Sequence, residues 1–329
     1  MLRVVPSPRD RQLVRRTLGW DGQGGSFLKN AGEEFGITRE RARQVFDRAV
    51  EQIRDLPLGE TLEEALGLVR CLCNQSADRI QAELRRQGFT RYEFALPVLV
   101  KTALLFGRAP KFALEEAGGR LFAVTGPGVV RSVLRAVQQS STRYGVQTVE
   151  DICAAIPQRR RTARDELLIR QILETRADLC WLDQDKQWFW LATLARNPVV
   201  RCAKKLLVHA SPLTLASLHQ AIHRLPRERK VPLPLDALAR FCRQAPFCRV
   251  RGGTVEVAGQ LPSKSLVSRA EAVVCEILRR HGNELPFERL RVLCASTGVS
   301  EPNLWRIVLH SPLVFRSAPR TYRLVTAAR

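Results

Sequence analysis

The sequence predicts a mainly α-helical protein with short β-hairpins. Three observations lead to this fold class. Amphipathic helical patterns fill most of the chain, a glycine-rich loop and a tight turn separate three of them near the N-terminus, and pairs of short strand-like segments recur further along. At 329 residues with 45% hydrophobic content, the chain is long enough to bury several small cores.

The charge of the chain is strongly basic. Lysine and arginine number 53 against 32 acidic residues, which gives a net charge of +21, and the sequence pI is near 10.7. Such an excess favours a polyanionic partner such as DNA or RNA. The sequence has no run of eighteen apolar residues and no signal-peptide pattern at its start, so we expect a cytoplasmic protein without a membrane segment.

The N-terminal region has the pattern of a helix-turn-helix. A first helix ends near Gly22, glycines interrupt the chain up to Gly25, and a second helix runs from Ser26 to Phe35. The segment 36–38 then provides a turn glycine, an inward isoleucine and a threonine that can cap a third helix.

The third helix is amphipathic. Its expected buried stripe consists of Ala42, Val45, Phe46, Ala49, Val50 and Ile53. Its expected exposed face carries Arg39, Glu40, Arg41, Arg43, Gln44 and Arg48. Arginine, glutamine and glutamate are side chains that recognise base edges in the major groove of DNA.

Residues 10–56 resemble region 4 of the sigma-70 family of transcription initiation factors. The resemblance is carried by the segment Leu18–Gly22 and by the run from Glu33 to Gln44, which reads EEFGITRERARQ. It implies that Arg39, Glu40 and Gln44 read bases, and that Arg41, Arg43 and Arg48 contact phosphates. The sequence contains no aromatic segment of the kind with which sigma factors melt promoter DNA, so we do not expect this chain to initiate transcription by itself.

The rest of the chain contains a fourfold repeat. Four strand-like segments begin 67 residues apart, at Leu121, Trp188, Val255 and Tyr322, and each follows a shorter apolar segment and a turn. These pairs predict hairpins. Helical patterns precede each hairpin, including the segments 129–137, 149–156 and 163–175 of the second copy and 287–295 of the fourth, where Ser300 is expected to cap the next helix.

Three helices followed by a hairpin in about 65 residues resemble a winged helix. We therefore predict five domains: a helix-turn-helix at 1–57 and winged helices at 58–125, 126–192, 193–260 and 261–329. Such arrays are similar to those of transcription-machinery and chromosome-associated subunits. Winged helices bind DNA or dock proteins, so the fold alone leaves both roles open.

Basic loops within the repeat are further candidates for phosphate contacts. In the second copy these are Arg159, Arg160, Arg161 and Arg164, and in the third copy Arg224, Arg227, Arg229 and Lys230. The fourth copy offers only Arg306 beside Trp305, which makes it the best candidate for protein docking.

No sequence motif indicates an enzyme, a cofactor or a metal site. Phosphate-binding loops, dinucleotide-binding motifs and nucleophile elbows are absent from the sequence. The nine cysteines include no C-x-x-C pair, and we expect reduced, buried thiols. The stretch His219–His223 lacks the glutamate of a zinc protease and is interpreted as one helical face with two histidines.

Three functions remain open. The first is a sequence-specific regulator that binds double-stranded DNA through the recognition helix, in association with the nucleoid. The alternative is a DNA-binding scaffold subunit of a larger bacterial complex, of the mobile-element or phage-defence type, whose winged helices dock partner proteins. A third is direct docking on RNA polymerase, because sigma region 4 also contacts the polymerase.

Overall fold

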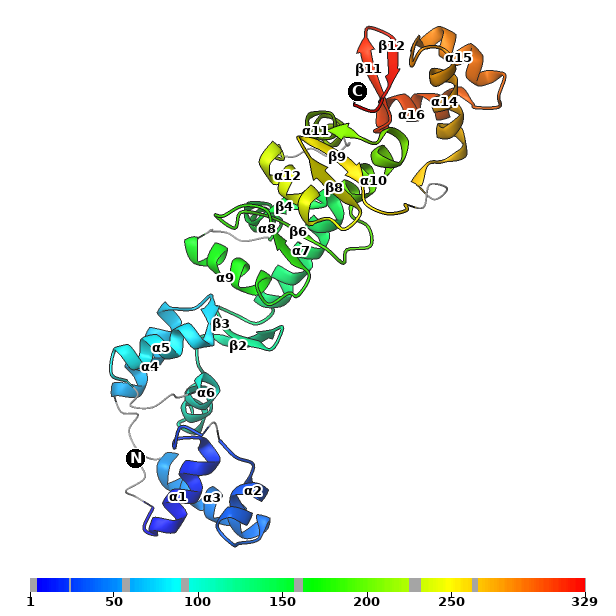
Figure 1. The fold of residues 1–329 in the computed structure, drawn as a ribbon. Helices are drawn as coiled ribbons and strands as arrows, with labels where there is room; N and C mark the ends of the chain where they lie inside the picture. The colour runs from blue at the N-terminus through cyan, green and yellow to red at the C-terminus, as the bar shows by residue number, and fades with distance from the viewer. Residues whose placement is uncertain are drawn as a thin grey trace. The chain divides into compact units, whose positions relative to one another are not determined.

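The computed structural model describes residues 5–23, 25–54, 60–89, 95–156, 162–224, 232–261 and 266–328 (Figure 1). Over these residues the protein is mainly helical, as the sequence predicts, and it has small three-stranded antiparallel sheets. No helix in these ranges is both long enough and apolar enough to cross a lipid bilayer.

Three helices form the N-terminal part, α1 (Pro8–Leu18), α2 (Leu28–Glu34) and α3 (Arg39–Arg54). The Ser7 hydroxyl accepts a hydrogen bond from the Asp10 amide at 3.3 Å, and a left-handed Gly19 with φ 78° ends α1. Thr38 caps α3 as predicted, because its hydroxyl accepts a hydrogen bond from the Arg41 amide at 3.2 Å.

The remaining elements follow one order four times: helix, short strand, two helices and a hairpin. The first copy consists of α4 (Glu60–Cys71), β1 (Gln75–Ser76), α5 (Ala77–Arg86), α6 (Leu96–Leu105), β2 (Ala113–Ala117) and β3 (Arg120–Val124). The second consists of α7 (Val129–Tyr144), β4 (Val146–Thr148), α8 (Val149–Ala155), α9 (Ala163–Leu173), β5 (Leu179–Trp181) and β6 (Trp188–Leu191).

The third and fourth copies repeat this order. The third consists of α10 (Pro198–Ala210), β7 (Leu213–Thr214), α11 (Leu215–His223), α12 (Leu235–Gln244), β8 (Cys248–Arg251) and β9 (Thr254–Val257). The fourth consists of α14 (Arg269–Arg280), β10 (Glu284–Pro286), α15 (Phe287–Ala295), α16 (Glu301–His310), β11 (Val314–Ala318) and β12 (Thr321–Leu324). Ser300 precedes α16 as expected, but its side chain makes no capping hydrogen bond.

All four sheets have the same strand order. The last strand of each copy lies in the middle, between the short first strand and the other arm of the hairpin, as in β1-β3-β2 and β7-β9-β8. Gly118 and Gly119, with φ of 53° and 77°, form the left-handed turn that joins β2 to β3. The four predicted hairpins are confirmed, whereas the sequence analysis did not predict the short first strands.

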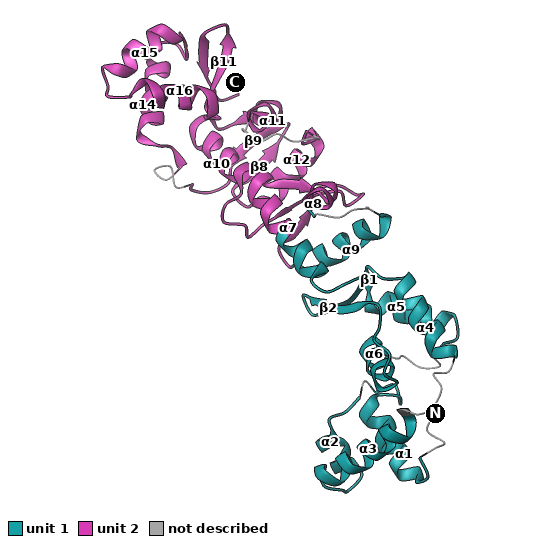
Figure 2. Ribbon diagram, turned by 180° about the vertical axis from the view of Figure 1, so that it is seen from behind, with its two compact units in different colours: residues 1–135, 156–176 teal, residues 136–155, 177–329 magenta. Residues whose placement is uncertain are grey.

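The contacts divide the chain into two units, coloured separately in Figure 2. Unit 1 comprises residues 1–135 and 156–176, and unit 2 comprises residues 136–155 and 177–329. Helix α9 of the second copy thus groups with the N-terminal helices and the first copy. Unit 2 holds the third and fourth copies around one continuous apolar cluster that includes Phe241, Val255, Leu278 and Leu304.

Unit 1 has an apolar cluster that extends across the predicted boundary at residues 57 and 58. Val14 and Leu18 of α1 and Ile53 of α3 belong to the same buried cluster as Val69 of α4 and Leu99 of α6. The helix-turn-helix and the first copy therefore share a hydrophobic core.

Candidate nucleic-acid interface

The turn between α2 and α3 is closely packed around Gly32. A Cβ atom at this position would lie 2.9 Å from the Ile37 carbonyl oxygen and 3.4 Å from Ala42 Cβ. Gly36, with φ 64°, provides the left-handed residue of the turn. Ile37 packs against a small cluster that includes buried Leu13 and Ala42, so it lies inward as the sequence predicts.

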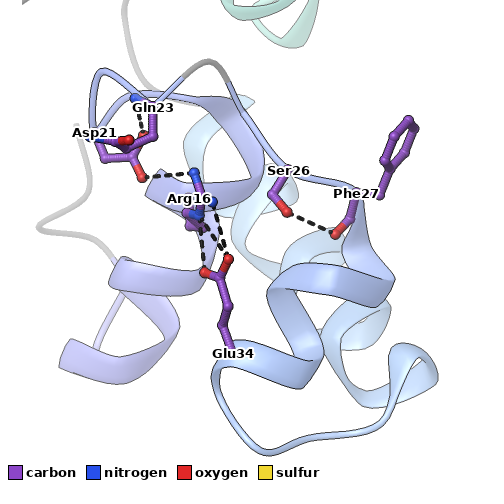
Figure 3. A network of polar contacts seen from close by, with 6 residues as sticks. All are labelled: Arg16, Asp21, Gln23, Ser26, Phe27 and Glu34. Atoms are coloured by element: carbon purple, nitrogen blue, oxygen red, sulfur yellow. Dashed lines mark hydrogen bonds and ion pairs between the residues drawn. The ribbon is translucent and has the colours of Figure 1, made fainter.

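A polar network fixes α2 against α1 (Figure 3). Arg16 of α1 donates hydrogen bonds to both oxygens of the Glu34 carboxylate at the end of α2, from Nε to Oε2 at 3.0 Å and from Nη2 to Oε1 at 3.1 Å. Arg16 Nη1 also lies 3.7 Å from Asp21 Oδ2. The hydrogen bond from Arg16 lowers the pKa of Glu34 below its ordinary value, and Glu34 in turn raises the pKa of Arg16.

Helix α3 has the predicted two faces. Ala42, Val45, Ala49 and Ile53 are buried, while Phe46 and Val50 are half-buried. The opposite face is exposed, and it carries all six residues predicted to contact DNA on this helix: Arg39, Glu40, Arg41, Arg43, Gln44 and Arg48. The structure thus brings these six side chains together on one exposed helical surface.

Two of the predicted base readers are paired with arginines on the same helix. Arg43 donates hydrogen bonds to both carboxylate oxygens of Glu40, from Nε at 3.2 Å and from Nη2 at 2.9 Å. Arg41 Nη1 donates to Gln44 Oε1 at 3.3 Å. The Arg43 hydrogen bond lowers the pKa of Glu40, so this carboxylate is charged at neutral pH.

A groove beside the N-terminal end of α3 contains further cationic side chains. Lys29 of α2, Arg39 of α3 and Lys101 of α6 line it together with Phe27 and Phe46. Phe27 is 82% exposed, and Figure 3 shows its ring directed away from α2. Neither Lys29 nor Lys101 was among the residues predicted from the sequence. Lys101 could not be predicted, because it lies 62 positions after Arg39 and reaches the groove only through the packing of α6.

The predicted phosphate contacts in the repeat fall mostly outside the described residues. This is the case for Arg159, Arg160, Arg161, Arg227, Arg229 and Lys230. Arg164 is described and exposed on α9, where its Nη1 donates a hydrogen bond to the Cys71 carbonyl oxygen. One edge of this guanidinium is therefore already used within unit 1. Arg224 is half-buried after α11 and donates hydrogen bonds to the Val314 and Pro312 carbonyl oxygens, each at 3.2 Å, so its guanidinium is used within unit 2.

The third helix of the first copy takes part in packing within the chain. Trp20 Nε1 donates a hydrogen bond to Thr102 Oγ1 of α6 at 2.7 Å, and Lys101 Nζ donates to the Thr17 carbonyl oxygen at 3.3 Å. Helix α6 is apolar on nearly all sides, which fits an element covered by neighbours on several faces.

The third helices of the next two copies are packed in the same way. In α9, the Gln171 side chain accepts a hydrogen bond from the Ser76 amide at 3.0 Å. In α12, Gln244 accepts a hydrogen bond from Trp190 Nε1 at 3.1 Å and donates one to the Trp181 carbonyl oxygen at 2.9 Å. Trp190 is a core residue, with 2% of its surface exposed.

Helix α16 of the fourth copy presents a different surface. Trp305 and Leu309 lie one turn apart and are 40% and 59% exposed. Arg306 is exposed beside them. This helix therefore combines two exposed apolar side chains with one arginine.

Comparison with known protein families and with characterised proteins finds no match to this chain. Within the described ranges, no group of three histidine, cysteine, aspartate or glutamate side chains is arranged to hold a metal ion. The exposed face of α3, with its six charged and polar side chains, and the groove beside it form the candidate functional site.

Proposed function

We propose that this chain is a DNA-binding protein that recognises a specific double-stranded sequence by inserting α3 into the major groove. The observation that carries the proposal is the exposed face of α3, where three arginines, one glutamate and one glutamine lie within the first six residues of a helix that follows a tight turn. Its resemblance to sigma region 4 supports Arg39, Glu40 and Gln44 as base readers.

The surroundings of this face fit a polyanion. Lys29 and Lys101 add positive charge beside Arg39, and the whole chain carries +21. The pairs Glu40–Arg43 and Arg41–Gln44 hold side chains in place before binding, and they exchange partners when DNA arrives. No catalytic residue or cofactor is part of the proposal, and a cytoplasmic, nucleoid-associated location follows from it.

The repeated part of the chain is proposed to consist of four winged helices. The support is the order helix, strand, helix, helix, hairpin, together with the common strand order in all four sheets. Because the third helices α6, α9 and α12 engage neighbouring parts of the chain, we assign them a role in stacking the array, and we assign base recognition to α3.

The test is binding-site selection from a randomised duplex library, followed by anisotropy titrations with the selected duplex. Arg39→Ala is expected to lose about 1–3 kcal/mol of discrimination at one base pair. Arg48→Ala is expected to weaken binding to all sequences alike and to reduce the salt slope by about one unit. Arg70→Ala, an exposed arginine at the end of α4, is the matched control and should change neither quantity.

The selection experiment also has a result that contradicts the proposal. Recovery of no preferred motif, with equal salt slopes for the parent and Arg48→Ala, would remove the assignment of α3 as a reading helix.

A second function is favoured by α16. Its exposed Trp305 and Leu309 suit a protein surface better than a phosphate backbone, which favours a DNA-binding scaffold subunit that docks a partner protein. A stoichiometric complex that co-purifies with the parent chain after nuclease treatment, and is lost in Trp305→Ala, would support this role. The presence of polymerase subunits in that complex would identify RNA polymerase as the partner.

A further inference from the structure

Two histidines of α11 converge on one backbone carbonyl in unit 2. His219 Nε2 lies 2.7 Å from the Leu233 carbonyl oxygen, and His223 Nε2 lies 3.3 Å from the same oxygen. The two Nε2 atoms are 3.0 Å apart, and the rings meet edge to face with centroids separated by 4.3 Å. Three atoms that carry lone pairs therefore form a small triangle.

Hydrogen bonds satisfy this triangle poorly. A neutral imidazole has one N–H group, so the Nε2 atom of each ring either donates or accepts. If both Nε2 atoms donate to the Leu233 oxygen, two N–H groups face each other across 3.0 Å. If only His219 donates, its single hydrogen cannot be directed both to the oxygen at 2.7 Å and to the His223 lone pair.

A metal ion satisfies all three atoms at once. In octahedral coordination, neighbouring ligands about 2.1 Å from the ion lie at right angles and are separated by about 3.0 Å. The three observed separations, 2.7, 3.0 and 3.3 Å, are centred on that value. They leave a point about 2.1 Å from all three atoms that lies about 1.2 Å out of their plane.

We propose that His219, His223 and the Leu233 carbonyl bind one six-coordinate divalent transition-metal ion, of the group that includes Zn²⁺, Co²⁺ and Ni²⁺, with water in the remaining three positions. Imidazole nitrogen is a ligand that Zn²⁺, Co²⁺ and Ni²⁺ favour. His223 is exposed and His219 half-buried, so the ion reaches the site from solvent. The Leu233 side chain is 2% exposed and anchors the carbonyl.

The ion joins the end of α11 to the chain just before α12. Residues 215–223 form the helix that carries both imidazoles, and Leu233 lies two residues before α12 begins at Leu235. Binding therefore holds the two middle helices of the third copy together at one end. This site is independent of the DNA-reading role proposed for α3, and its test does not involve DNA.

The test is calorimetric titration of the metal-free full chain with Zn²⁺ under reducing conditions, together with the absorption spectrum of the Co²⁺ complex. We expect one Zn²⁺ per chain, a Co²⁺ spectrum of nitrogen and oxygen ligands without thiolate bands, and a rise in Tm on adding Zn²⁺. His219→Ala and His223→Ala should each weaken Zn²⁺ binding more than about tenfold. His310→Ala, an exposed histidine at the end of α16, is the control and should bind as the parent does.

Several results would overturn the proposal. These are no Zn²⁺ binding by the parent, unchanged binding in His219→Ala and His223→Ala, or a Co²⁺ spectrum dominated by thiolate bands from the cysteines. Any of them would leave a hydrogen-bonded histidine pair. If His219→Ala lowers the Tm of the metal-free chain, the decisive variant is His223→Gln, because His223 is exposed and its replacement leaves the buried residues of α11 in place.

Discussion

The hydrogen bond between Trp20 and Thr102 is expected to hold the helix-turn-helix on the first copy. The indole Nε1 donates to Thr102 Oγ1 at 2.7 Å, and the same hydroxyl donates to the Val98 carbonyl at 2.8 Å. Thr102 is 4% exposed, so water cannot easily replace a lost partner. Trp20→Phe keeps an aromatic ring, removes the donor and leaves a buried acceptor unsatisfied, at a cost of about 1–3 kcal/mol.

The assay is hydrogen exchange of the full chain, read by mass spectrometry in peptides from α1 and α6. A loss of about 2 kcal/mol increases the opening equilibrium, and hence the exchange rate, about 30-fold. Thr102→Val removes the acceptor, and the double variant Trp20→Phe/Thr102→Val should cost less than the sum of the two single changes by about 1 kcal/mol. Trp305→Phe, which changes a partly exposed indole on α16, should leave exchange in α1 unchanged.

Two results would contradict this prediction: single and double changes that are additive within about 0.3 kcal/mol, or faster exchange of α6 alone. Either result would mean that the Trp20 hydrogen bond contributes nothing to the joint stability of the helix-turn-helix and the first copy.

Two other predictions concern charged pairs. Arg16→Gln should return the pKa of Glu34 upward toward 4.5, measured by NMR titration of carbon-labelled glutamate. Because the pKa of Glu34 is lowered in the folded state, its contribution to stability is present above the unfolded pKa and is lost as the pH falls through the folded pKa. In Arg16→Gln the free energy of unfolding of unit 1 should therefore decrease less on acidification than it does in the parent. The second pair is buried: Lys205 Nζ lies 2.5 Å from the Glu271 carboxylate, and the Glu271 side chain is 6% exposed. Lys205→Met should destabilise unit 2 by about 3–5 kcal/mol in urea unfolding, because it leaves a buried carboxylate without its cation.

Each of these predictions has a control and a contradicting result. For Glu34 the control is Arg15→Gln on the exposed side of α1, which should leave the pKa of Glu34 where it is in the parent. An unchanged Glu34 pKa in Arg16→Gln would contradict the prediction. For the buried pair, Lys205→Met combined with Glu271→Gln should recover much of the lost stability. Arg201→Met, on the exposed side of α10, is the control and should lower the stability of unit 2 only slightly. An equal loss of stability in Lys205→Met and Arg201→Met would show that the buried ion pair is not the cause.

The local structure of this chain follows from short-range features of its sequence. The turn at Gly36 needs a left-handed residue, and the apolar stripe of α3 repeats with the helical period, so both were predictable from nearby residues. The 67-residue spacing gave the four hairpins, because strand alternation and turn residues are also local signals. The exposed face of α3 followed from its buried face.

Which helices and strands contact one another depends on the tertiary packing. The short first strands, such as β1 at Gln75–Ser76, carry too few residues for a pattern and exist because β3 pairs with them. The packing of α6 against the N-terminal helices brings Thr102 to Trp20. The same packing places Lys101 in the groove that Arg39 also lines. The distance from His223 to Leu233 depends on the packing of α11 beside the chain that leads to α12. Such long-range contacts leave no periodic signal in the sequence, because they depend on how whole helices pack, whereas the helices themselves depend on neighbouring residues.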